Sequence, residues 1–115
     1  MQKINFKAKG NDLRDAFHPI HLTEVDGTAL RLVLIQGEYH WHLHPEEDEF
    51  FIVVQGTLTV EFPDHTVQLQ EWEGIRIPKG TPHRTKAEDQ TVVLIIEPVQ
   101  TDTRGVRIED LGGGV

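Results

Sequence analysis

Cysteine is absent from the 115 residues of the chain. Its absence excludes disulfide bonds, thiolate catalysis, iron–sulfur clusters and cysteine-ligated zinc, so any bound metal must be held by nitrogen and oxygen ligands. Long apolar runs are absent as well. The longest runs, FFIVV at 50–54 and VVLII at 92–96, are far shorter than the ~20 residues that cross a membrane. The first residues, MQKINFKAKGND, lack the apolar stretch of a secretory signal. We therefore expect a cytoplasmic protein without a membrane partner.

Basic residues are scarce, because 11 Lys and Arg stand against 19 Asp and Glu, for a formal net charge of −8. Phosphate binding needs a basic surface, so we expect no nucleic-acid partner. Hydrophobic residues make up 37% and charged residues 26%, which suits a folded domain. The length allows one domain with its own core and is short for two. We expect a single domain over 1–115, with 1–28 as an N-terminal segment and 108–115 as a flexible tail.

Strand patterns dominate the sequence between these ends. Alternating or continuous apolar residues, bounded by Gly, Pro or Asp, predict strands over 29–37, 38–44, 49–56, 57–62, 66–70, 74–78 and 91–98. Only the segment 11–21 favours a short turn of helix, which Pro19 would end. Short strands with frequent turns are typical of an all-β sandwich or barrel.

The stretch HWHLHPEEDEF, from position 40, concentrates side chains that bind metals. His42 and His44 lie two residues apart on a predicted strand, so both project from the same face. Pro45 ends that strand, and an antiparallel neighbour that begins at Glu49 would return a carboxylate beside the two imidazoles. His83 follows the turn in PKGTPH as a fourth candidate ligand.

Three imidazoles and one carboxylate form a donor set for one divalent transition metal, such as iron, manganese, nickel or zinc. An HxH pair alone is a weak signal, because a lone strand histidine is more often a surface or hydrogen-bonded residue. The combined spacing, H-x-H-x4-E-x6-G followed by P-x-G-x2-H, is much harder to obtain by chance. We predict metal ligands at His42, His44, Glu49 and His83.

The stretches HLHPEEDEFFIVVQG and PKGTPH resemble the two sequence motifs of the cupin superfamily, and the chain is similar to its small single-domain members. The resemblance runs from Gly37 to His83. It implies a double-stranded β-helix, or jelly-roll barrel, that holds a metal in its interior. The same resemblance assigns the four ligand positions to the four residues predicted from spacing, and it also points to a homodimer.

Two further features flank the predicted ligands. His40 shares their predicted strand face, so we interpret it either as a catalytic proton carrier or as a hydrogen-bonded polar residue at the barrel mouth. Tyr39, Trp41 and Leu43 should point the other way, and such an apolar face needs a cover. Residues 1–20 could provide it, or a second subunit, which again favours a homodimer.

A short basic segment, RIPKGTPHRTK, contains Arg76, Lys79, Arg84 and Lys86. Inside a pocket these side chains would favour an anionic substrate such as a carboxylate, whereas solvated loop residues would have no such role. Strand alternation makes Arg76 the strongest candidate for an inward position. Glu97 would be either a surface residue at a strand end or a partner for one of these cations.

Three functions fit these observations. We favour a small metalloenzyme that acts on a small organic substrate as an oxygenase, with the metal binding substrate and oxygen. A metal-dependent sugar isomerase or epimerase would instead use the cation to polarise a carbonyl group and would need no oxygen. The third is a non-catalytic protein that binds a small molecule, and the sequence alone does not decide whether the domain is catalytic.

Overall fold

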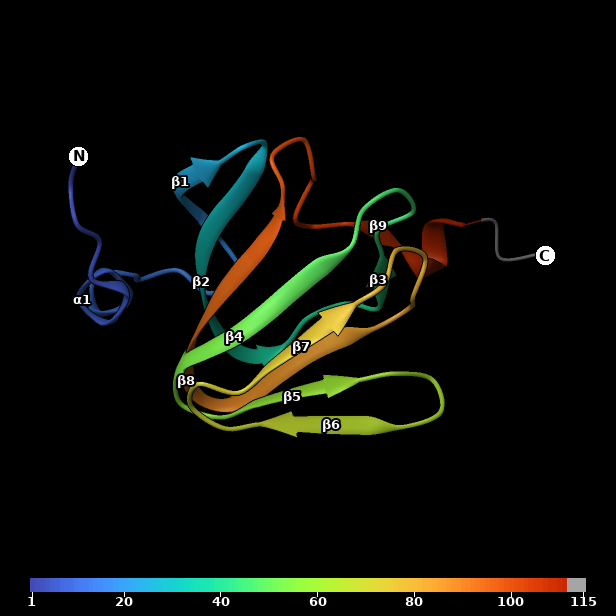
Figure 1. Cartoon of the computed structure of the whole chain (residues 1–115). Helices are drawn as coiled ribbons and strands as arrows, with labels where there is room; N and C mark the ends of the chain where they lie inside the picture. Colours follow the sequence, from blue (N-terminus) through green and yellow to red (C-terminus); the bar gives the residue numbers. More distant parts are fainter. Residues whose placement is uncertain (112–115) are drawn as a thin grey trace.

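Strands make up about half of residues 1–111, the part of the chain that the computed structural model describes (Figure 1). In chain order the elements are α1 (Phe6–Asn11), β1 (Ile20–Val25), β2 (Thr28–Glu38), β3 (His42–Leu43), β4 (Glu49–Gln55), β5 (Leu58–Glu61), β6 (Thr66–Leu69), β7 (Gly74–Ile77), β8 (Arg84–Pro98), β9 (Val106–Arg107) and the 3-10 helix η1 (Ile108–Asp110). The prediction of an all-β fold is confirmed.

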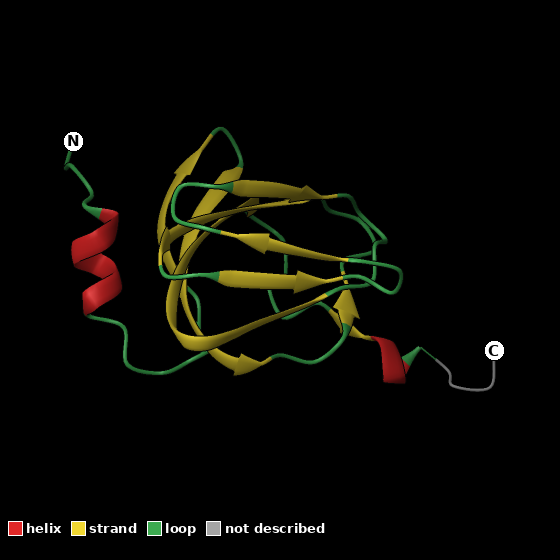
Figure 2. Ribbon diagram, turned by 90° about the horizontal axis from the view of Figure 1, so that it is seen from below, coloured by secondary structure: helices red, strands yellow, loops and turns green. Residues whose placement is uncertain are grey.

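The long strand β8 joins the two layers of the fold. Its second half runs between β2 and β4 in the main sheet, whose order is β1-β2-β8-β4-β7. Its first residues pair with β5 in place of β4, and β5 forms a hairpin with β6. The strands thereby wrap around an interior, with α1 outside them (Figure 2). The predicted jelly roll is confirmed, although within residues 1–111 the sheets do not close into a continuous barrel.

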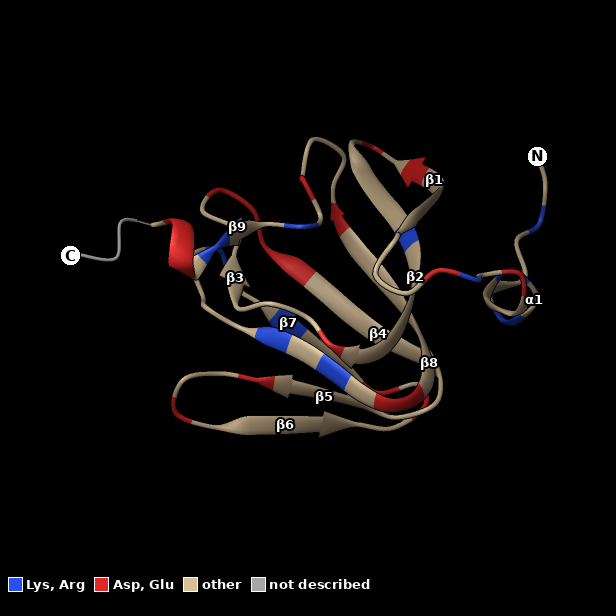
Figure 3. Ribbon diagram, turned by 180° about the vertical axis from the view of Figure 1, so that it is seen from behind, with Lys and Arg blue, Asp and Glu red and all other residues tan. Residues whose placement is uncertain are grey.

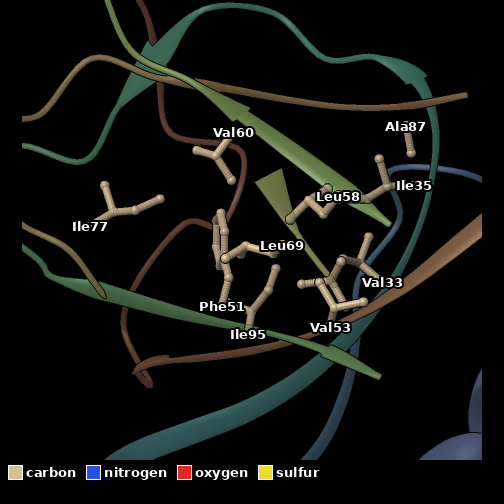
Figure 4. Packing of buried hydrophobic residues seen from close by; sticks show 11 residues of the cluster. Val33, Ile35, Phe51, Val53, Leu58, Val60, Leu69, Ile77, Ala87 and Ile95 are labelled. Carbon is tan, nitrogen blue, oxygen red and sulfur yellow. The ribbon is translucent and has the colours of Figure 1, made fainter. Parts of the chain in front are cut away.

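Two apolar clusters lie on opposite faces of the main sheet, because successive strand side chains alternate between faces. The first fills the interior (Figure 4) and comprises Val33, Ile35, Phe51, Val53, Leu58, Val60, Leu69, Ile77, Ala87, Val93 and Ile95. The second lies on the outer face, where Phe6 and Leu13 of the N-terminal segment pack against it. Gly10 of α1 fits closely there, since a Cβ atom would lie 2.8 Å from Val92 Cγ1.

Several predicted elements need correction. The helical turn expected within 11–21 is misplaced, because α1 starts at Phe6 after Asn5, whose side chain accepts a hydrogen bond from the Ala8 amide and caps the helix. Strand β1 has no predicted counterpart. The strand expected over 38–44 shrinks to the two residues of β3. Strand β8 begins at Arg84 rather than at 91, since its polar first half lacks the apolar pattern of its second half.

The C-terminal residues fold back onto the strands. Strand β9 pairs with β3, and the Ile108 amide donates to the Trp41 carbonyl at 3.0 Å. The Trp41 ring is half-buried, and the Arg84 guanidinium lies over it at 5.3 Å. The predicted tail 108–115 thus begins with η1, and 112–115 lie outside the described residues. In the described chain, neither helical segment has the length and apolar character to span a membrane.

Candidate metal centre

The four predicted ligands meet at one point in the interior. His42 lies in β3, His44 directly after it, Glu49 at the start of β4, and His83 immediately before β8. One donor atom from each lies within 4.8 Å of the others. All four side chains are buried, at 4% exposure or less. The structure therefore brings together the full predicted set, and their binding of a metal stays a prediction.

The backbone places these residues differently from the sequence-based expectation. Strand β3 does not pair with β4, because its neighbour is β9, and β4 pairs with β7 and β8. Glu49 reaches the histidines across the interior instead. Two backbone hydrogen bonds join His42 and His83, from the His42 amide to the His83 carbonyl at 3.0 Å and in return at 2.9 Å. This bridge fixes two of the imidazoles side by side, with ring centroids 4.3 Å apart.

Backbone carbonyls select the tautomers of two imidazoles. Nδ1 of His42 lies 3.0 Å from the His40 carbonyl, and Nδ1 of His83 lies 2.8 Å from the Thr81 carbonyl. A carbonyl oxygen can only accept, so each Nδ1 carries the hydrogen and donates it. Each Nε2 is then left with a free lone pair, the arrangement that metal-binding histidines adopt.

Three buried polar atoms at the centre lack hydrogen-bond partners among residues 1–111. They are Nε2 of His44, Oε1 of Glu49 and Nε2 of His83. The Glu49 oxygen lies 3.0 Å from the His44 nitrogen and 3.5 Å from the His83 nitrogen, but these contacts lack hydrogen-bond geometry. Buried polar atoms are almost always satisfied. Three unsatisfied donor atoms that converge fit a bound divalent cation, and nitrogen and oxygen ligands suit iron, manganese, nickel or zinc.

Burial and neighbouring groups set the protonation of this centre. Burial, together with the nearby His83 ring, lowers the pKa of His42 to about 3, so that imidazole stays neutral. Burial acts to raise the pKa of Glu49, but the imidazoles of His44 and His83 outweigh it and hold that pKa below its ordinary range. Burial lowers the pKa of His44, but the Glu49 carboxylate overcomes this effect and raises it. The centre thus holds an ionised carboxylate among imidazoles.

Glu97 is a second buried carboxylate beside Glu49, with 1% exposure. Its Oε1 accepts hydrogen bonds from Arg31, at 2.7 Å, and from the Thr103 hydroxyl, while its Oε2 has no partner in the described part of the chain. Burial and then the neighbouring Glu49 raise the pKa of Glu97 to about 8. The cation that pairs with Glu97 is therefore Arg31, which the sequence-based interpretation did not consider.

Residues 98–107, which we call the C-terminal strap, run past the centre to β9. The Arg31 guanidinium anchors the first part of the strap, because it donates hydrogen bonds to the carbonyls of Val99 at 2.7 Å and Thr101 at 2.9 Å. At its other end β9 pairs with β3. Between them Gly105 lies against His42, where a Cβ atom would come within 2.5 Å of the imidazole Cδ2. The strap therefore packs on the first ligand, a role that no local sequence pattern signals.

His40 lies outside the group of four. Its ring centroid is 5.4 Å from that of His42, and its Nε2 lies 3.3 Å from the Arg104 carbonyl of the strap. Its catalytic role stays a prediction. The expectation that Tyr39 points away from the site is wrong. Its ring stacks on Phe17 at 5.1 Å and meets the His42 ring edge-on at 5.2 Å, because the backbone is not a regular strand at 39–41.

The basic residues of RIPKGTPHRTK lie away from the centre. Arg76, expected to point inward, is exposed and lies 3.4 Å from Asp48, so that expectation is wrong. In the antiparallel register Ile77, not Arg76, is the buried neighbour on β7. Arg84 and Lys86 pair with Glu61 at 3.0 and 3.3 Å. Figure 3 shows these basic positions on β7 and at the start of β8.

A small cavity adjoins the centre inside the jelly roll. Its floor is the apolar inner face of β2, β4 and β8, with Val33, Ile35, Phe51, Val93 and Ile95. Its other lining residues are Phe17, Pro19, Tyr39, His42, Glu49, Thr85, Thr103 and Arg104. Two of the four candidate ligands thus face this space. The sequence gives no local signal for Phe17, because it reaches the cavity from the N-terminal segment.

Known proteins resemble this chain in sequence and in fold. A family model described as Cupin domain, Cupin_2, matches residues 29–97. The uncharacterized protein YdbB of Bacillus subtilis (strain 168) is 39% identical over 86% of this chain and 88% of its own length. A cupin-2 domain containing protein from Shewanella frigidimarina has a crystal structure that matches with a TM-score of 0.80, at 38% identity, over 83% of this chain and 93% of its own. One chain of hydroquinone 1,2-dioxygenase PnpCD has a similar fold. It matches with a TM-score of 0.69, at 17% identity, over 82% of this chain and 71% of its own.

Proposed function

The chain belongs to the cupin domain family, and on that premise we propose that it is a metal-dependent oxygenase that acts on a small organic molecule. The observation that carries the proposal is the convergence of four buried donor atoms within 4.8 Å, three of them without a hydrogen-bond partner among residues 1–111. His42, His44, Glu49 and His83 would hold the metal. When bound, a redox-active divalent metal would supply a site where dioxygen and a substrate oxygen come together.

The chain's own residues would prepare this site in three ways. The carbonyls at His40 and Thr81 orient two ligand imidazoles, so their Nε2 atoms face inward. The cavity beside the centre would bind the substrate and exclude bulk water. A dioxygenase reaction places both oxygen atoms of dioxygen in the product, so the substrate itself supplies the four electrons and no external reductant is needed.

The character of the cavity favours an oxygenase over a sugar isomerase. A sugar carries a hydroxyl group on nearly every carbon, and each would lose its hydrogen bonds to water against the apolar floor. An apolar molecule would lose nothing there. The fold likeness to hydroquinone 1,2-dioxygenase PnpCD, a protein in complex with Cd2+ and 4-hydroxybenzonitrile, also supports the proposal.

Oxygen uptake tests this function. We would load the protein with iron(II) and record dioxygen consumption with a panel of small alcohols, phenols, thiols, carboxylates and sugars. The matched controls are zinc-loaded protein and the double variant His42→Ala, His83→Ala. Uptake with some substrate, lost in both controls, is the expected result. Turnover of a sugar without oxygen, also with zinc, would instead establish the isomerase alternative. Binding of a small molecule without turnover would instead indicate a non-catalytic binding protein.

A further inference from the structure

We propose that the cavity binds a molecule about the size of one aromatic ring, uncharged apart from a single oxygen donor that is directed to the side where His42 and Glu49 lie. Phenols are the chemical class that this describes. The inference rests on the proposed function, because it concerns the substrate of the same site. Size, surface and charge of the cavity each contribute to it.

The size of the cavity limits the ligand to a single ring. Its volume is about 40 Å³, which is room for a single six-membered ring and too little for a fused ring system.

The surface of the cavity suits an aromatic body. The apolar floor would contact one face of a ring, and Val33, Ile35 and Ile95 are each at most 4% exposed (Figure 4). At the rim, the rings of Phe17 and Tyr39 stack on each other. Phe17 has a φ of 64°, a left-handed conformation that is unfavourable for a bulky side chain. Such conformations persist where the surroundings impose them and are frequent at ligand sites.

The charges at the cavity disfavour an anionic group away from the metal side. Arg104 contributes the only guanidinium among the described lining residues, and this group already contacts both carboxylate oxygens of Asp102 at 3.2 Å. The free positive charge would be the divalent cation itself, and it would lie at the side of His42 and Glu49. An anionic group elsewhere in the cavity would be desolvated without a cationic partner. A ligand whose one oxygen donor lies at the metal side avoids this cost.

Calorimetric titration of zinc-loaded protein tests the inference without relying on turnover. The probes are phenol, cyclohexanol, 4-hydroxybenzoate, 2-naphthol and glucose. For a ligand as small as phenol we expect a dissociation constant on the order of 1 mM. Cyclohexanol should bind about threefold more weakly or worse, because it lacks the ring face. In 4-hydroxybenzoate the phenol oxygen is kept but a carboxylate stands at the other end of the ring, so it should bind at least about tenfold more weakly. The larger 2-naphthol and the polar glucose should give no binding heat.

A rim variant provides the matched comparison. Phe17→Leu keeps an apolar side chain but removes the aromatic face, and should weaken phenol binding roughly three- to tenfold. Phe50→Leu, on the outer face of β4 and outside the cavity, should leave phenol binding unchanged. Equal effects of the two variants would contradict the rim assignment.

The outcomes separate this inference from the proposed function. If zinc binds but phenol does not, or if 4-hydroxybenzoate or 2-naphthol binds as tightly as phenol, the substrate class is wrong and the metal centre stands. If zinc does not bind, both the proposed metal centre and the proposed substrate class are wrong. Phenol binding that requires zinc, is weakened by Phe17→Leu and is not matched by the other probes supports both.

Discussion

Replacement of Gly105 by alanine should weaken metal binding, although this residue is not a candidate ligand. Gly105 has a φ of 68°, so an alanine there costs about 1–2 kcal/mol through backbone strain alone. Its Cβ would also lie 2.5 Å from the Cδ2 of His42 and 2.9 Å from the Leu43 carbonyl oxygen. Either the C-terminal strap or the imidazole must move. Because such supporting contacts orient metal ligands, we expect the zinc affinity to fall by roughly 10- to 100-fold.

Gly27→Ala is the matched control for this variant. Gly27 has a φ of 80°, but no atom lies within 4 Å of the position its Cβ would take. Both variants should therefore lower the melting temperature of metal-free protein, by about 4 °C per kcal/mol. Only Gly105→Ala should lower the zinc affinity, measured by competition with a chromophoric chelator. Equal zinc affinities in the two variants would refute the idea that the strap positions His42.

Three further predictions concern pH and assembly. Because burial raises the pKa of Glu97 to about 8, the folded chain retains a proton that the unfolded chain releases at lower pH. Metal-free protein should therefore lose on the order of a few kcal/mol of stability in urea titrations as the pH rises from about 5 to 8, and Glu97→Gln should flatten this dependence. Because the pKa of His44 is raised, zinc must displace a proton from its imidazole. Chelator competition should therefore show that the zinc affinity falls about tenfold per pH unit as the pH drops below that pKa. Sedimentation equilibrium should give twice the mass of the chain, as the homodimer prediction requires, and the mass of a single chain would contradict it.

The four candidate ligands could be predicted because their signal is local. His42, His44 and Glu49 lie within eight positions, and His83 follows a Gly and Pro turn that a sequence pattern can identify. The pattern did not indicate how they meet. Glu49 reaches the histidines across the interior rather than from a paired strand, since β3 pairs with β9. A two-residue strand is too short for any periodicity to reveal its partner.

The surroundings of the centre depend on contacts between distant positions. Arg31 and Glu97 are 66 residues apart, and the residues next to each in the sequence do not indicate that the two will pair. The stack of Phe17 on Tyr39 joins the N-terminal segment to the rim, where strand alternation placed Tyr39 on the opposite face. Alternation holds only while the strand is regular, and the backbone leaves the regular strand after Glu38. The prediction that Arg76 points inward was wrong for a related reason, because the register of β7 buries Ile77 instead.

Metal content tests whether His42, His44, Glu49 and His83 bind a metal. We would determine it by mass spectrometry on tag-free protein purified without nickel resin, beside the double variant His42→Ala, His83→Ala. We predict about one divalent transition metal ion per chain in the wild type and none in the variant. Equal metal in both proteins, or none in the wild type after incubation with iron, manganese, nickel or zinc, would contradict it.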